Sequence, residues 1–135
     1  EEALQEDPGN RLIMNRLIRV YLEGAETLKA AQLMERLAEG IPGDTSAIYR
    51  ASLLYKRSRN ITSAIDLGER IRLRETEHPR NLLALADSYA YSGNVARSLR
   101  ILEEFQELEP DNPRGRLLRE AVQKRAGQLK SDASE

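Results

Sequence analysis

Apolar residues recur along the chain at intervals of three and four positions, which is the spacing of one face of an α-helix. The first stripe of this kind is made of Met14, Leu17, Ile18 and Tyr21. The second is made of Ala30, Leu33, Met34 and Leu37. Gly24 follows the first stripe and Pro42 follows the second, and both residue types favour the end of a helix. The pattern predicts two short amphipathic helices joined by a turn.

The same helix-turn-helix pattern returns near the end of the sequence. The first helix there carries Leu82, Leu85, Ala86 and Tyr89. The second carries Leu99, Leu102, Phe105 and Leu108. Ser92-Gly93-Asn94 lies between them as the predicted turn. A weaker pair is predicted in the middle, where Gly68 stands at the position that Met34 and Leu102 occupy in the other pairs.

Single residue types also repeat, at a period of 34 positions. The tyrosines at this period are Tyr21, Tyr55 and Tyr89. The small residues are Ala30, Ala64 and Ser98. Pro8 and Pro42 are 34 positions apart, and Pro42 and Pro110 are twice that distance apart. A fixed period of this length indicates a protein that stacks one structural unit several times.

In these residues the chain resembles the tetratricopeptide repeat family, whose unit of about 34 residues is a helix hairpin. Repeat one covers 11–44, repeat two covers 45–78, and repeat three covers 79–112. Repeat two is degenerate, because Gly68 and Thr76 replace a large apolar residue and the closing proline. The resemblance implies an all-α fold, a right-handed α-solenoid of stacked helix-turn-helix repeats.

Both ends of the sequence extend the pattern. Residues 1–10 carry Ala3, Leu4 and Pro8 and resemble the end of a preceding, partial repeat. We therefore expect a fragment of a longer repeat protein, with an exposed apolar edge that favours end-to-end stacking of copies. Residues 113–130 continue the helical spacing with many charges and are expected to form a capping helix, whereas 131–135 are expected to be a disordered tail.

The resemblance implies that the first helix of each repeat lines a concave groove for a partner segment. The stripe beside the packing stripe supplies the candidate binding residues Asn15, Arg19, Tyr49, Leu53, Lys56, Arg80, Leu83 and Asp87. This set is apolar at its middle and carries three basic residues against one acidic residue. The expected partner is a protein or peptide segment with apolar and acidic character.

The tyrosines allow two interpretations. Aromatic side chains at a regular pitch can stack on bases or sugars. Tyr21, Tyr55 and Tyr89 lie on the apolar stripes with the leucines, so packing between helices is the favoured role. Tyr49 and Tyr91 lie off those stripes and are better candidates for contact with a ligand.

Composition argues against most catalytic chemistry. The 135 residues include no cysteine and a single histidine, His78, so thiolate nucleophiles and Cys/His zinc sites lack their ligands. The formal net charge of −1 offers no general field for nucleic acid. No apolar run is long enough for a membrane span, and residues 1–6 do not resemble a signal peptide. We expect no enzyme activity and no cofactor, while the cytoplasm and the bacterial periplasm both remain open.

Three groups of polar residues are candidates for a metal, catalytic or phosphate-binding site. His78 follows Glu75 and Glu77, but one imidazole beside turn carboxylates favours a solvated turn over a metal site. The carboxylate pairs Glu103–Glu104 and Glu107–Glu109 are predicted to be solvated surface. Arg70, Arg72 and Arg74 interleave with acidic residues, which favours a salt-bridged surface over a phosphate site.

Three functions fit this architecture. The first is a scaffold for protein–protein interaction that docks a partner segment in the groove. The second is an architectural spacer in a bacterial envelope or exopolysaccharide-export assembly, where 17 arginines against four lysines are typical of a GC-rich bacterial genome. The third, recognition of a charged polymer, is disfavoured by the net charge.

Overall fold

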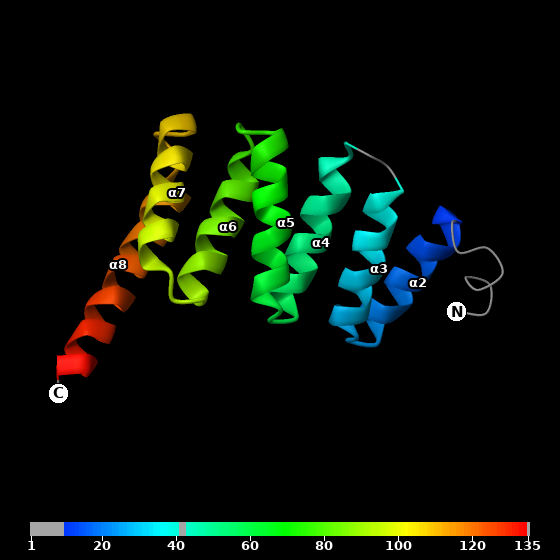
Figure 1. The fold of residues 1–135 in the computed structure, drawn as a ribbon, viewed down its shortest axis with the longest axis horizontal. Coiled ribbons are helices and arrows are strands. Elements are labelled where there is room, and N and C mark those ends of the chain that lie inside the picture. Colours follow the sequence, from blue (N-terminus) through cyan, green and yellow to red (C-terminus); the bar gives the residue numbers. More distant parts are fainter. Residues whose placement is uncertain (1–9, 41–42, 135) are drawn as a thin grey trace. The chain divides into compact units, whose positions relative to one another are not determined.

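The computed structural model describes the backbone of residues 10–40 and 43–134, and the side chains within these ranges as far as Gln128. Within these ranges the chain forms seven α-helices and no strand, which confirms the predicted all-α class (Figure 1). The helices are α2 Arg11–Glu23, α3 Thr27–Glu39, α4 Thr45–Arg57, α5 Ile61–Arg74, α6 Pro79–Tyr91, α7 Val95–Leu108 and α8 Pro113–Ser134.

The chain divides into two compact units, Glu1–Glu75 and Thr76–Glu135. In the first unit α2 packs on α3, α3 on α4, and α4 on α5. In the second unit α6 packs on α7, and α8 packs on both of them. Each unit is therefore a stack of consecutive helices in which a hairpin leans on the element that follows it. The right-handed sense of the solenoid stays a prediction.

The predicted apolar stripes form the core of each unit. In the first unit Met14, Ile18, Met34 and Tyr55 belong to one buried cluster, while Leu17 and Tyr21 pack against it from its edge. In the second unit the side chains with almost no exposed surface include Leu82, Leu85, Ala86, Ile101, Leu102 and Phe105. Burial of side chains of this size stabilises each by roughly 1.5–3 kcal/mol.

Small side chains are needed where the two helices of a hairpin cross. Ala30 and Ala64 are buried at this position in the first unit. Ser98 takes the same place in the second unit, and its Oγ donates a hydrogen bond to the Ala86 carbonyl oxygen across the hairpin at 2.7 Å. The buried hydroxyl is thereby satisfied, so serine and alanine are interchangeable in size at this column.

The turns within the hairpins share one backbone conformation, although the residue type at corresponding positions differs. Ala25, Arg59 and Gly93 are 34 positions apart, and each has a positive φ, of 59°, 65° and 92° respectively. Each turn is closed by a hydrogen bond from the next amide to the carbonyl of the column tyrosine, at 2.8 to 2.9 Å. The interpretation of Gly24 as the helix breaker is correct for the end of α2, but the left-handed residue is Ala25.

The starts of the first helices repeat in the same way. Asn10 accepts a hydrogen bond from the Ile13 amide at 3.2 Å, and Asp44 accepts one from the Ala47 amide at 3.3 Å. His78, another 34 positions along, accepts one from the Asn81 amide through Nδ1 at 3.1 Å. All three are N-caps, which satisfy amides that the first turn of a helix leaves without a partner.

The two ends of the chain differ in how they compare with the sequence-based predictions. The partial repeat proposed for residues 1–10 falls almost wholly on 1–9, which lie outside the described residues, as does Pro42. The disordered tail proposed for 131–135 is wrong for 131–134, because α8 continues to Ser134. No proline and no closing turn interrupts the segment after Gly127, so the helix begun at Pro113 simply propagates.

Candidate functional site

The candidate binding residues divide between the two units, so they are described as two sets. Asn15 and Arg19 lie on α2, and Tyr49, Leu53 and Lys56 lie on α4 of the first unit. Arg80, Leu83 and Asp87 lie on α6 of the second. In the first set Asn15 and Tyr49, like Arg19 and Leu53, are 34 positions apart and so occupy corresponding positions of the two first helices.

In the first unit this helix surface combines exposed apolar and basic side chains. Leu53 of α4 is 37% exposed, and Asn15 and Arg19 of α2 are exposed. Leu12 and Leu22, on the same stripe of α2, are also exposed. We call the five residues Asn15, Arg19, Tyr49, Leu53 and Lys56 the first-helix surface. That these residues form one groove for a partner stays a prediction.

Tyr49 has a more structural position than expected. Its side chain is half-buried and packs against the core of the first unit. Tyr91, the other tyrosine outside the stripes, is 50% exposed. Tyr49 therefore presents only part of its ring to a partner, and its removal affects the core as well as the surface.

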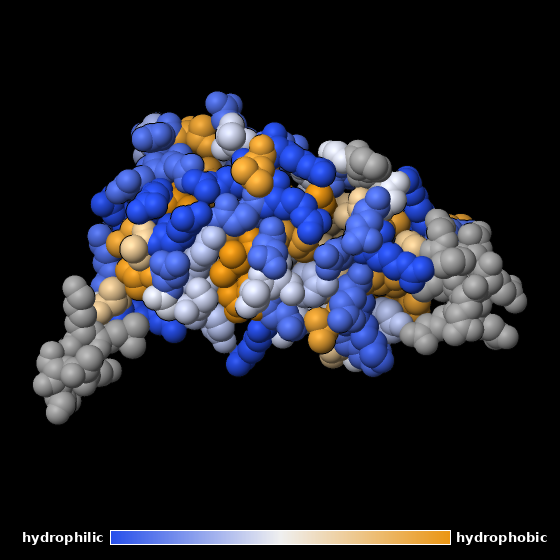
Figure 2. Space-filling view, viewed as in Figure 1, coloured by the Kyte–Doolittle hydropathy of each residue, from blue (hydrophilic) through white to orange (hydrophobic). Residues whose placement is uncertain are grey.

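In the second unit the candidate residues are less exposed. Arg80 is exposed, whereas Leu83 and Asp87 are half-buried. Ala90, which follows in the same stripe, is buried. Figure 2 shows hydrophilic residues over much of the visible face of the molecule, with hydrophobic residues in separate spots between them.

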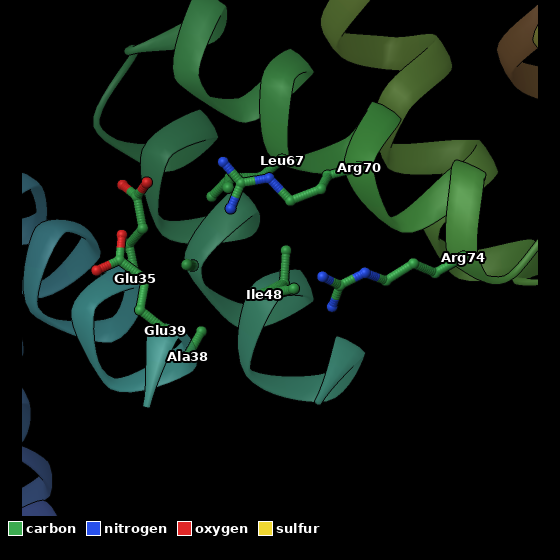
Figure 3. A pocket seen from close by; sticks show the side chains of 8 residues that line it. Glu35, Ala38, Glu39, Ile48, Leu67, Arg70 and Arg74 are labelled. Carbon is green, nitrogen blue, oxygen red and sulfur yellow. The ribbon is translucent and has the colours of Figure 1, made fainter. Parts of the chain in front are cut away.

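Sequence reasoning missed a cleft in the first unit, formed by α3, α4 and α5. It has a volume of about 190 Å³ and is lined by Glu35, Ala38, Glu39, Ile48, Ala51, Leu67, Arg70 and Arg74. Glu35 and Glu39 come from α3 and the two arginines come from α5, while α4 supplies Ile48 and Ala51 (Figure 3). We call it the α3–α5 cleft.

The arginine ladder beside this cleft is only partly the salt-bridged surface that the sequence suggested. Arg72 pairs with Glu69 at 3.3 Å, as expected for residues three positions apart on a helix. Arg70 and Arg74 line the cleft instead. Glu75, another member of the predicted network, accepts a hydrogen bond from the Thr45 hydroxyl at 2.5 Å. The spacing of four between Arg70 and Arg74 was the available signal, because it puts both side chains on one helix face.

A hydrogen bond between hairpins lies beside the cleft. The Tyr55 hydroxyl of α4 donates to Glu35 Oε1 of α3 at 2.5 Å. Burial raises the pKa of Tyr55 well above its usual value, and the hydrogen bond to Glu35 and the charges of Glu35 and Glu39 raise it further. The folded state therefore favours the neutral, protonated hydroxyl of Tyr55. Glu35 is committed to this contact, whereas Glu39 is exposed.

His78, the metal candidate of the sequence, has a structural role. His78 caps α6 through Nδ1, which replaces the solvated-turn interpretation with a specific one. Among the residues that the structure describes, no three acidic or histidine side chains come together so that they could hold a metal ion. Over the same ranges, none of the helices combines the length and the apolar character of a membrane span.

Comparison with solved structures identifies the fold. A tetratricopeptide repeat protein from Parabacteroides merdae is 16% identical, with a TM-score of 0.78 over 96% of this chain and 52% of that chain. MamA is 16% identical, with a TM-score of 0.70 over 99% of this chain and 86% of that one. YrrB, described as a TPR protein with an unusual peptide-binding site, is 16% identical, with a TM-score of 0.67 over 98% and 69%.

These matches show that the chain has the tetratricopeptide repeat fold, as the residue pattern predicted. The chain spans about half the length of the Parabacteroides protein. A scan against protein-family models finds no match, and neither does a search of curated proteins.

Proposed function

We propose that this chain, with its tetratricopeptide repeat fold, is a non-enzymatic scaffold that binds a partner protein through the first helices of its hairpins. The observation that carries the proposal is the first-helix surface of the first unit. Leu53 is 37% exposed there, although each helix of the unit has a buried stripe that satisfies the core. The peptide-binding site that the name of YrrB mentions is a property of that protein, and it supports the same kind of role here.

The partner segment would carry apolar and acidic side chains. Leu53 and the exposed part of Tyr49 offer apolar contact, and desolvated contacts of this type supply most of the binding energy at an interface. The basic side chains Arg19 of α2 and Lys56 of α4 would orient an acidic segment and speed its association. Arg80, on the second unit, is exposed to solvent as well.

The test is a selection of short random peptides displayed on phage against the whole chain, repeated with Leu53→Glu/Arg19→Glu. Both residues are exposed, so the variant should keep its helicity and melting temperature. We expect the chain to enrich acidic peptides with apolar anchors, and the variant to bind them at least about tenfold more weakly, a change of about 1.4 kcal/mol. A selected peptide that binds the folded variant with unchanged affinity would refute the proposal.

A matched control separates surface from core. Arg36→Glu also reverses an exposed charge, but on α3, the second helix of its hairpin. It should leave the affinity of the acidic peptides nearly unchanged. If Arg36→Glu and Leu53→Glu/Arg19→Glu weaken binding equally, net charge rather than the first-helix surface governs it.

End-to-end self-association is a second, weaker role for the same unit. Leu12 and Val20 of α2 are about 60% exposed, and Leu28 of α3 is 40% exposed. Apolar side chains in this number at one end of a helix stack favour contact with another copy or a further repeat. Sedimentation velocity should show association that depends on concentration and that Val20→Glu abolishes, while a monomer at all concentrations would exclude this role.

A further inference from the structure

We infer that the α3–α5 cleft is a second binding site, on a face of α4 different from the first-helix surface, for a peptide segment in which an aliphatic side chain lies between a basic and an acidic residue. The cleft lies entirely within the first unit. Its lining residues on α4 are Ile48 and Ala51, whereas the first-helix surface uses Tyr49, Leu53 and Lys56. A partner can therefore occupy one site without covering the other.

The floor of the cleft is apolar. Ala38, Ile48, Ala51 and Leu67 line it, and all four are buried side chains of the core. The volume of about 190 Å³ is below the roughly 300 Å³ at which sites for whole small-molecule ligands begin. It suits one aliphatic side chain of leucine size better than a cofactor.

The walls carry opposite charges. Glu35 and Glu39 are four positions apart on α3, and Arg70 and Arg74 are four positions apart on α5. Like charges at this spacing repel one another and destabilise the helix that carries them. Figure 3 shows both arginine side chains extending from α5 toward the α3 side, with the Arg74 guanidinium pointing toward Ile48. An occupant that brings a cation to the α3 wall and an anion to the α5 wall offsets both repulsions.

The charge arrangement selects against uniformly charged ligands. A polyanion is attracted by Arg70 and Arg74 but repelled by Glu39. A polycation is attracted by Glu39 but repelled by the two arginines. A segment with both charges, one on each side of its apolar residue, is attracted by both walls. Because the guanidinium groups are planar donors, they favour a carboxylate in bidentate geometry on the α5 side.

The test selects short random peptides displayed on phage against the whole chain and then measures the affinity of a synthetic selected peptide by fluorescence anisotropy. We expect one enriched class to contain an aliphatic residue flanked by a basic and an acidic residue. Arg70→Glu/Arg74→Glu should weaken this peptide at least about tenfold, and Glu39→Lys should weaken it in the same direction. Glu39 is chosen because Glu35 also holds Tyr55.

Two controls make each result decisive. Arg70→Lys/Arg74→Lys keeps the charge but loses the planar bidentate geometry, so it should weaken binding less than Arg70→Glu/Arg74→Glu does. Circular dichroism should show unchanged helicity for each variant, so that a loss of binding is not a loss of fold. Leu53→Glu should leave this peptide unaffected, because it alters only the first-helix surface. If no peptide class with both charges is enriched, or if its binding depends on Leu53 and not on the arginines, the cleft is not a binding site, whatever the fate of the function proposed above.

Discussion

The contact between a second helix and the helix that follows it occurs once in each unit, as α3 with α4 and as α7 with α8. Corresponding positions in the two contacts are 68 residues apart, or two repeats. In the first contact the buried residues Leu37 and Ala47 take positions that Phe105 and Gly115 take in the second. A larger side chain in one helix is thus matched by a smaller one in the other.

The two contacts therefore share the combined volume of the facing side chains rather than their residue types. A Cβ atom at Gly115 would lie 2.7 Å from Cδ1 and 2.8 Å from Cε1 of the Phe105 ring. The ring has no exposed surface, so it has no free space into which to move. Close packing of this kind makes the glycine a requirement of the phenylalanine.

The polar contacts of the two junctions differ as well. In the first unit the Tyr55 hydroxyl reaches Glu35 of α3. In the second unit Gln123 stands at the position that corresponds to Tyr55, and the polar contact is made by Arg119, which donates to Gln106 Oε1 at 3.2 Å. The first junction therefore has a hydrogen bond between two ionisable groups, and the second has one between an arginine and a neutral amide.

The largest effect is expected from Gly115→Ala. Overpacking against Phe105 should lower the free energy of unfolding by about 2 kcal/mol, as measured by urea denaturation. Gly127→Ala on the same helix is the matched control, because nothing lies within 4 Å of a Cβ there, and alanine should be neutral or stabilising. Phe105→Leu/Gly115→Ala recreates the residues of the first junction and should recover much of the loss. Strict additivity of the two changes would contradict the volume argument.

Tyr55→Phe tests the polar half of the comparison. Loss of the hydrogen bond to Glu35 should cost about 1.5 kcal/mol at neutral pH, because the acceptor is charged and partly buried. Because the pKa of Tyr55 is raised in the fold, its contribution is present below the unfolded pKa near ~10 and is lost as the pH rises above it. The stability of the variant should consequently decline less steeply at alkaline pH. Tyr91→Phe, at an exposed ring, should change little at neutral pH.

Gly93→Ala extends the comparison to the turns. The residue has a φ of 92°, where a Cβ is strained although nothing crowds it. The free energy of unfolding should fall by about 1 kcal/mol. Gly24→Ala is the control, because Gly24 has a negative φ of −86° and ordinary contacts around its Cβ position. Equal effects at the two positions would show that turn conformation does not decide the cost.

The smallest effect is the reverse change in the first unit. Ala25→Gly and Arg59→Gly each place glycine where the backbone already has a positive φ. Relief of strain should raise the melting temperature slightly, with a gain of about 0.5 kcal/mol per site, since glycine also loses more entropy on folding. Calorimetry of the two variants should show gains of similar size, because the turns share one geometry. A loss at either site would contradict the assignment of strain to it.

Much of the fold follows from local patterns that the sequence displays. Leucine, alanine and tyrosine columns at a period of 34 predicted the six helices α2 to α7 and much of their buried faces, because a helix shows its packing face at every third or fourth residue. Helical spacing alone predicted α8, but Leu117 of its expected stripe is 55% exposed. The column of N-caps at Asn10, Asp44 and His78 was present at the same period. It passed unnoticed because histidine is an unusual cap, and its nitrogen acts only when the backbone brings the Asn81 amide to it.

The α3–α5 cleft and the fit of Gly115 to Phe105 depended on tertiary structure alone. Glu39 and Arg70 are 31 positions apart in sequence, and no local pattern indicates that they line one cleft. The sequence around Gly115 likewise gives no sign of the Phe105 ring that packs against it. Periodicity determines which face of each helix is buried, because that depends on neighbours in the chain. Which residues each face contacts depends on how helices from different hairpins pack together. At such a contact, the volume and charge that fit at one position depend on a side chain far away in sequence.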